Sequence, residues 1–124
     1  VEYESVQDVL NEQPNLELLK QLGQLRTAIT AQSSVDVAIT ASKNAQYDCV
    51  SRYFAPAMGI PEDPVTGSIH TAIAPLWAEL LGKTELVAYQ ASARGGVLYC
   101  RVLEHERIEI SGYAQLYLQG EIMI

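Results

Sequence analysis

The stretch from residue 67 to residue 81 constrains the fold most, because it has helical spacing but almost no polar face. Its apolar residues recur at the i, i+3, i+4 and i+7 positions of one helical face: Ile69, Ala72, Ile73, Leu76, Trp77, Leu80 and Leu81. On the remaining faces only His70 and Glu79 can carry a charge, and Gly82 is typical of a helix end. We therefore predict a buried helix over 67–81. Because Pro75 lacks a backbone N–H, we expect either a bend there or another donor for the carbonyl that Pro75 leaves free.

Strand-like patterns lie on both sides of this helix. Strands are expected at 27–32, 35–41 and 47–54 before it, and at 85–90, 97–103, 107–111 and 113–118 after it. Near the N-terminus, Pro14 and Asn15 favour the start of an amphipathic surface helix at about 14–22. We therefore predict one α+β domain over 1–124, with a strongly curved mixed or antiparallel sheet wrapped around the helix at 67–81.

Composition narrows the possible partners. The chain has 8 Lys plus Arg against 15 Asp plus Glu, a net charge of -7, and its basic residues are scattered, so nucleic acid is not expected. No apolar run approaches the ~20 residues that span a bilayer. Cys49 and Cys100 lie far apart, without the spacing of metal ligands or of a disulfide framework. These features predict a cytoplasmic protein with no metal site and no membrane segment.

The loop 59–68 is the most chemically dense part of the chain, and it leads directly into the predicted buried helix. The first N–H groups of a helix lack partners within the helix and carry the positive end of its dipole, so they bind anions such as carboxylates. Gly67 allows a ligand close to the backbone, and Ser68 offers a hydroxyl donor. Asp63, held near those amides, is a candidate for moving a proton.

Structural interpretations of the same residues stay open. Asp63 and Thr66 are typical helix caps, and Pro64 would stiffen the turn before the helix. His70 fits either a hydrogen-bonded core histidine or a group that faces the site. Other candidate carboxylate binders, Arg52 and Arg94, fit solvated ion pairs equally well.

The motif Glu62-Asp63-Pro64-Val65-Thr66-Gly67-Ser68, followed by His70, resembles the E-D-P-x-T-G-S-x-H signature of the PhzF-like isomerase family, which has the diaminopimelate epimerase fold. Segments 47–56 and 92–96 also resemble that family in the expected order. The similarity runs through residues 35–121 and corresponds to the C-terminal half of the family's chains. Ile69 and Thr71 depart from the residues usual at their positions, which affects the expected substrate more than the fold.

The resemblance implies a cofactor-independent isomerase built from two similar halves, with a small carboxylate substrate bound between them. It implies that Asp63 and Ser68 assist catalysis, and that Thr66, Gly67, Ser68 and His70 contribute to substrate binding. The family's principal acid/base is a glutamate of the other half, and no segment of this chain matches it. The implied partner is therefore a complementary N-terminal half, or a second copy of this chain.

Four functions follow as hypotheses. The chain forms one wall of an isomerase that transfers a proton on a small carboxylate, or it forms a homodimer whose two copies each supply Asp63. Alternatively, it is a non-catalytic module that binds small carboxylates without the glutamate. A hotdog-type thioesterase, which also wraps a sheet around a buried helix, is the fourth possibility.

Overall fold

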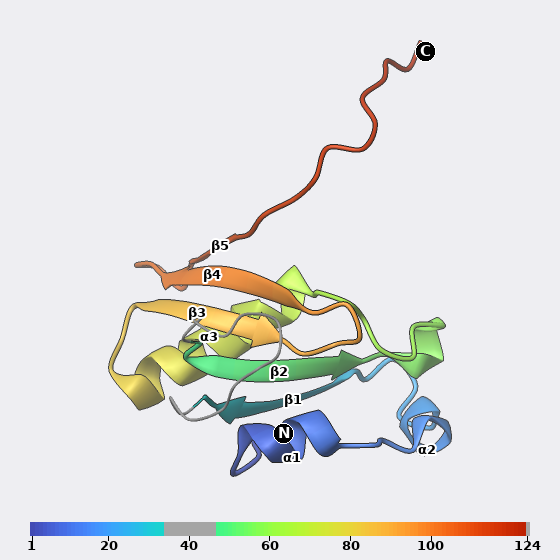
Figure 1. The fold of residues 1–124 in the computed structure, drawn as a ribbon, viewed down its shortest axis with the longest axis vertical. Helices are drawn as coiled ribbons and strands as arrows, with labels where there is room; N and C mark the ends of the chain where they lie inside the picture. The colour runs from blue at the N-terminus through green and yellow to red at the C-terminus, as the bar shows by residue number, and fades with distance from the viewer. Residues whose placement is uncertain (34–46, 124) are drawn as a thin grey trace.

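The computed structural model describes residues 1–33 and 47–123, and these form a five-stranded mixed sheet in the order β1-β2-β3-β4-β5 (Figure 1). Its strands are β1 (Thr27–Gln32), β2 (Cys49–Phe54), β3 (Glu85–Gln90), β4 (Gly96–Val102) and β5 (Ile108–Ser111). Only the β2–β3 pairing is parallel; the other three are antiparallel. The strand predicted at 35–41 lies outside the described residues, and β1 pairs with β2.

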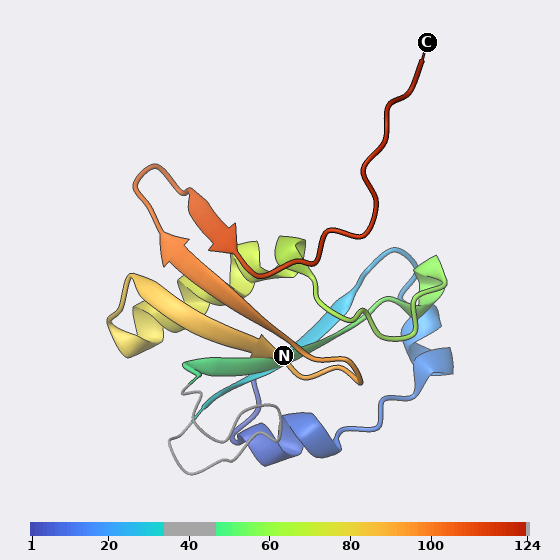
Figure 2. The ribbon, with the colours of Figure 1, turned by 45° about the horizontal axis from the view of Figure 1, so that its top comes forward.

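Helices cover both faces of the sheet, as Figure 2 shows. On one face, α1 (Val6–Asn11) packs its buried Val6 and Val9 against a cluster that includes Val50 and Phe54 of β2. On the other face lies α3 (Gly67–Leu81). Because neighbouring strand residues point to opposite faces, Tyr89 joins the α1 side whereas Ala88 joins the α3 side.

The N-terminal region differs from the single helix predicted at about 14–22. It contains two short helices, α1 and α2 (Leu16–Lys20), separated by Pro14. The predicted start is confirmed, because the Asn15 side chain accepts from the Leu18 N–H at 3.1 Å. The prediction missed α1, whose N-terminus is capped by Ser5. Its two valines are buried against the sheet, a tertiary contact that a six-residue stretch does not reveal.

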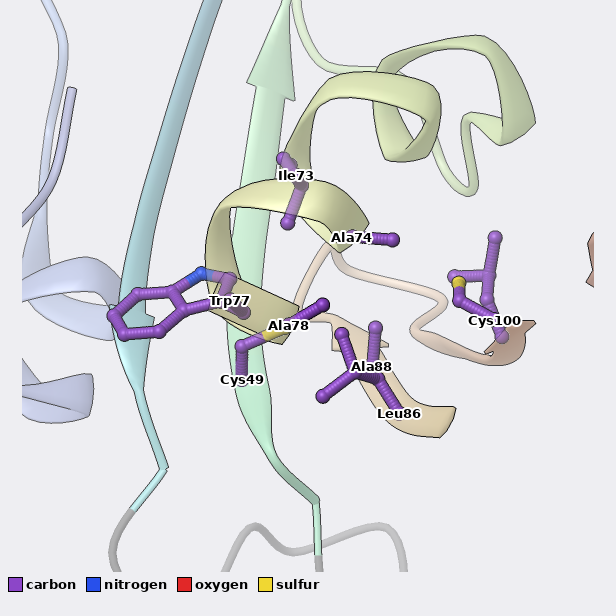
Figure 3. Packing of buried hydrophobic residues seen from close by; sticks show 9 residues of the cluster. Cys49, Ile73, Ala74, Trp77, Ala78, Leu86, Ala88 and Cys100 are labelled. Atoms are coloured by element: carbon purple, nitrogen blue, oxygen red, sulfur yellow. The ribbon is translucent and has the colours of Figure 1, made fainter. Parts of the chain in front are cut away.

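The helix predicted at 67–81 is confirmed with those bounds, and Gly82 ends it in the left-handed conformation. Pro75 lies inside α3 without ending it, while the Thr71 hydroxyl donates to the Ser68 carbonyl at 2.7 Å. The inner face of α3 packs on the sheet through Ile73, Ala74, Trp77 and Ala78, which meet side chains of β2, β3 and β4 (Figure 3). The buried indole N–H of Trp77 donates to the Thr30 hydroxyl at 2.9 Å.

The sheet is not strongly curled, which corrects the predicted wrapping around a central helix. β1 and β5 remain separate edges, and α3 packs against one face of an open sheet. Its outer side is therefore not buried: Leu76 is 39% exposed and Leu80 is 56% exposed. The prediction of burial on all sides was wrong for the described residues, because five strands cover only one side of the helix.

The strand predicted at 113–118 is also absent. After β5 the chain runs away from the sheet in an extended conformation (Figure 1), and its apolar side chains are almost fully exposed, including Tyr117 at 97%. Alternating apolar residues form a strand only when a neighbouring strand supplies hydrogen-bond partners, and none of the described residues does so. Among the described residues, no helix is long and apolar enough to cross a membrane.

Candidate functional site

Hydrogen bonds and an ion pair fix the loop before α3 to the sheet and to α1. The Asp63 backbone N–H donates to the Tyr53 carbonyl at 3.0 Å. Arg52 pairs with Glu62 through two contacts of 2.7 and 3.2 Å, and it also donates to the Val9 and Glu12 carbonyls. Arg52 is thus a half-buried structural anchor that joins the loop to α1, which excludes it from the candidate ligand-binding groups.

Thr66, the residue before α3, is held at three points. Its N–H donates to Oε1 of Gln90 at 2.7 Å, and its carbonyl accepts from Nδ1 of His70 at 2.8 Å. Its hydroxyl donates to Oδ2 of Asp63. These bonds fix both the backbone at the start of the helix and the carboxylate that precedes it.

His70 is fully buried and acts within this network. Since Nδ1 donates its proton to the Thr66 carbonyl, Nε2 is the acceptor, and the Ser51 hydroxyl lies 3.5 Å from it. Burial lowers the pKa of His70, while the hydrogen bond to Thr66 opposes that shift. The ring is therefore neutral and supports Thr66. No part of it is open to a ligand in this structure, so substrate binding by His70 stays a prediction that this placement does not favour.

Gln90 is a member of this hydrogen-bond network that the sequence did not single out. It lies at the end of β3 on the α3 side of the sheet, fully buried. Its Nε2 donates to the Asp63 carbonyl at 2.7 Å and to the Thr66 hydroxyl at 3.1 Å. One sequence signal could have identified Gln90: it is an amide residue on the buried face of a predicted strand, and a buried amide needs hydrogen-bond partners.

The start of α3 carries no side-chain cap. Thr66 has the extended backbone of an N-cap residue, with φ -117° and ψ 100°, but its hydroxyl bonds to Asp63 and leaves the helix amides free of it. Gly67 and Ser68 are exposed, and a Cβ at Gly67 would meet no atom within 4 Å. The capping interpretation is therefore wrong for Thr66, and the first two residues of the helix, Gly67 and Ser68, are exposed.

Beside this helix start lies a cavity of about 710 Å³. Gly67 forms part of its wall, and Arg94 and Gly95 line it from the connection between β3 and β4. Residues 111–115 close another side. Of the predicted site residues, Gly67 lines the cavity. Asp63 and Ser68 do not line it but are near Gly67 in the sequence. Thr66 and His70 are buried. The described residues contain no group of three or more potential metal ligands.

Comparison with known proteins agrees with this architecture. The sequence profile of the Phenazine biosynthesis-like protein family matches residues 1–120, so the chain belongs to that family. An uncharacterized isomerase of Pseudomonas aeruginosa is 54% identical over 86 residues, which are 69% of this chain and 33% of that protein. Another uncharacterized isomerase, from Halalkalibacterium halodurans, is 39% identical over all 124 residues and 43% of its own length.

Solved structures show the same relation. A phenazine biosynthesis PhzC/PhzF protein of Clostridium difficile superimposes with a TM-score of 0.80 at 43% identity, over 100% of this chain and 44% of the other. An Enterococcus faecalis protein of the PhzF family gives a TM-score of 0.71 at 32% identity, over 93% of this chain and 43% of the other. The chain thus spans less than half the length of these relatives.

Proposed function

We propose that this chain supplies one wall of a cofactor-independent isomerase site for a small carboxylate substrate. The observation that carries the proposal is the uncapped, exposed start of α3 next to an aspartate whose carboxylate is held in place by Thr66. Membership of a family whose relatives are named uncharacterized isomerases supports this reaction class.

In this proposal, the substrate carboxylate accepts hydrogen bonds from the amides at Gly67 and Ser68, where the helix dipole favours negative charge. The Ser68 hydroxyl is exposed and adds a further donor. Asp63 takes or returns a proton on the bound substrate. An isomerisation removes one proton and adds one, so the reaction has no net oxidation. We propose a second acid/base group on the opposite side of the substrate, as an inversion at carbon requires.

The second group must come from polypeptide outside these 124 residues, or from a second copy of them. The relatives are more than twice as long as this chain, and their remaining part is the partner that we propose. The exposed apolar outer face of α3 and the exposed segment after β5 are surfaces that such a partner would cover. A module that binds carboxylates without catalysing a reaction is the alternative. Exchange of substrate hydrogen with solvent deuterium distinguishes an isomerase from such a binding module.

The test uses the full-length protein in D2O with a panel of the standard L-amino acids and cyclohexene carboxylates, followed by mass spectrometry. Wild-type protein should place solvent deuterium on carbon in at least one of these acids. Asp63→Asn should lower the exchange rate about 10²–10⁴-fold, the usual contribution of a positioned acid or base, while the free energy of unfolding changes little.

Asp48→Asn is the matched control, because the Asp48 carboxylate has a purely structural role, accepting from the Val87 N–H at 2.8 Å and from Lys83 at 2.5 Å. This variant should lose stability and keep the exchange rate. A protein that binds acids of the panel but exchanges none of them would instead be a binding module.

A further inference from the structure

We propose that Gln90 is a positioning residue that acts on Asp63 through the Thr66 hydroxyl, and thereby determines which carboxylate oxygen of Asp63 is free to exchange a proton. The inference rests on the proposed function of Asp63. It concerns a fully buried residue that does not line the cavity.

The direction of each hydrogen bond follows from the chemistry of the groups. The Thr66 N–H can only donate, so the Gln90 atom that faces it at 2.7 Å is the amide oxygen. The amide nitrogen of Gln90 therefore points the other way, and its two protons go to the Asp63 carbonyl and to the Thr66 hydroxyl oxygen. No alternative orientation of the amide satisfies all three contacts.

This orientation determines the behaviour of the Thr66 hydroxyl. Because its oxygen already accepts from Gln90, its single proton is directed to Oδ2 of Asp63. Oδ2 is thus occupied by a neutral donor, and Oδ1 of the same carboxylate is the oxygen left for a substrate. Gln90 also holds the Asp63 backbone carbonyl at 2.7 Å, so one side chain fixes both ends of the aspartate.

Burial makes this arrangement rigid. Gln90 is fully buried and Thr66 is 8% exposed, so water does not compete for their hydrogen bonds. An unpaired polar group would be costly in such surroundings, which holds the whole set in one arrangement. Asp63, in contrast, is only half-buried, so part of it remains accessible to solvent. The hydrogen bonds that order Asp63 are therefore shielded from water, whereas Asp63 itself is not fully shielded.

A second buried threonine provides a matched comparison. The Thr30 hydroxyl accepts from Trp77 at 2.9 Å and donates to the Val50 carbonyl at 2.8 Å. It has the same burial and the same number of partners as Thr66, but neither partner is ionisable. Thr30→Val therefore reports the loss of a buried hydroxyl without an effect on any carboxylate.

The experiment measures kcat and KM for deuterium incorporation in the full-length protein, using the acid of the panel that wild type exchanges fastest. Gln90→Met and Thr66→Val should each lower kcat roughly 10–100-fold, as expected for a lost hydrogen bond to a charged group, and change KM little. Thr66→Ser keeps the hydroxyl and should restore most of the rate. Thr30→Val should destabilise the protein with kcat unchanged.

A double-mutant cycle with Asp63→Asn distinguishes positioning from a general loss of structure. If Gln90 acts through Asp63, then Gln90→Met should reduce kcat further by less than about twofold in the Asp63→Asn background. An equal reduction in both backgrounds would overturn the proposal, and so would Thr66→Val with wild-type kcat. If Gln90→Met does not fold, wild-type kcat in Thr66→Val would still overturn the proposal.

The two claims fail in different ways. Wild-type exchange that Asp63→Asn leaves intact would refute the proposed function of Asp63, and with it the role of Gln90. Exchange that Asp63→Asn abolishes but Gln90→Met and Thr66→Val leave intact would refute only the role of Gln90.

Discussion

The two ends of α3 rest on the same sheet but contact it in different ways. The N-terminal end meets a polar set, in which His70 and Thr66 bond to Ser51 of β2 and Gln90 of β3. Toward the C-terminal end, the contacts are mostly apolar: Trp77 and Ala78 belong to one cluster with Cys49, Leu86 and Cys100, all labelled in Figure 3.

The comparison separates two kinds of contact between the helix and the sheet. An apolar contact stabilises the fold by its buried area alone, whereas a buried polar set stabilises it only when every group is paired. Within the described residues, no buried side-chain nitrogen or oxygen lacks a partner. The fully paired polar set at the N-terminal end of α3 therefore holds Asp63 and Thr66 in one arrangement.

The largest expected effect lies at the apolar end. Trp77→Ala removes a fully packed side chain and leaves the Thr30 hydroxyl without its donor, so it should lower the free energy of unfolding by about 3–5 kcal/mol in urea titrations. Trp77→Phe keeps the ring volume nearer to native and should cost less. If Trp77→Ala instead reduced deuterium exchange at full stability, the division between the two ends would be wrong.

A smaller effect is expected at the helix start. Gly67→Ala adds a methyl group where no protein atom lies within 4 Å, so stability should change by about 0.5 kcal/mol or less. If a carboxylate binds there, the methyl group should raise its Kd about tenfold, or ~1.4 kcal/mol, in isothermal titration. Gly120→Ala, also in open space but far along the C-terminal segment, is the control. Equal Kd values in both variants would contradict the proposed binding position.

The polar end should also respond to acid. Because the pKa of His70 is lowered in the folded state, the unfolded chain binds more protons just below the ordinary histidine pKa of about 6.5. Stability due to neutral His70 is therefore complete above that pH and declines as the pH falls through it. Urea unfolding at pH 7.5 and pH 5 should show this decline, and His70→Gln should reduce it. His105→Gln, in an exposed turn, controls for loss of a histidine; an undiminished decline in His70→Gln would refute the assignment.

The apolar end should be inert to thiol chemistry. Burial raises the pKa of Cys49 to about 12 and that of Cys100 to about 11, so neither thiol forms a thiolate at pH 8. Ellman's reagent should label no cysteine in the folded protein and both in urea. Labelling of Cys100 under native conditions would show that the α3–β4 contact opens, which would weaken the contrast between the ends.

The sequence predicted those features that local patterns encode. The bounds of α3 followed from its apolar spacing and from Gly82, and the bounds of β3 followed from its β-favouring residues. Gly95 lies in the β3–β4 turn, where φ is +69° and a Cβ would lie 2.2 Å from the Tyr89 hydroxyl, so the local structure requires glycine there. Family membership followed from the motif at 62–70 and was confirmed over 1–120.

The remaining features depend on contacts between distant segments, which one sequence does not display. The role of Gln90 depends on partners 24 and 27 residues away, and the anchoring role of Arg52 depends on carbonyls about 40 residues away. The segment 113–118 has the alternation of a strand, but a strand also needs a neighbour, and the pattern does not supply one. Local spacing therefore located the candidate site but not the network that orders it.

The most direct test of the central claim is to record ¹H–¹⁵N spectra of the full-length protein during titration with benzoate and, separately, with L-glutamate. The claim is that the start of α3 binds a carboxylate. It predicts saturable shifts of the Gly67, Ser68 and Ile69 amide signals by at least one of these acids, with small changes at Trp77 and beyond. Saturable binding that shifts other amides and leaves residues 67–69 unchanged would contradict the account.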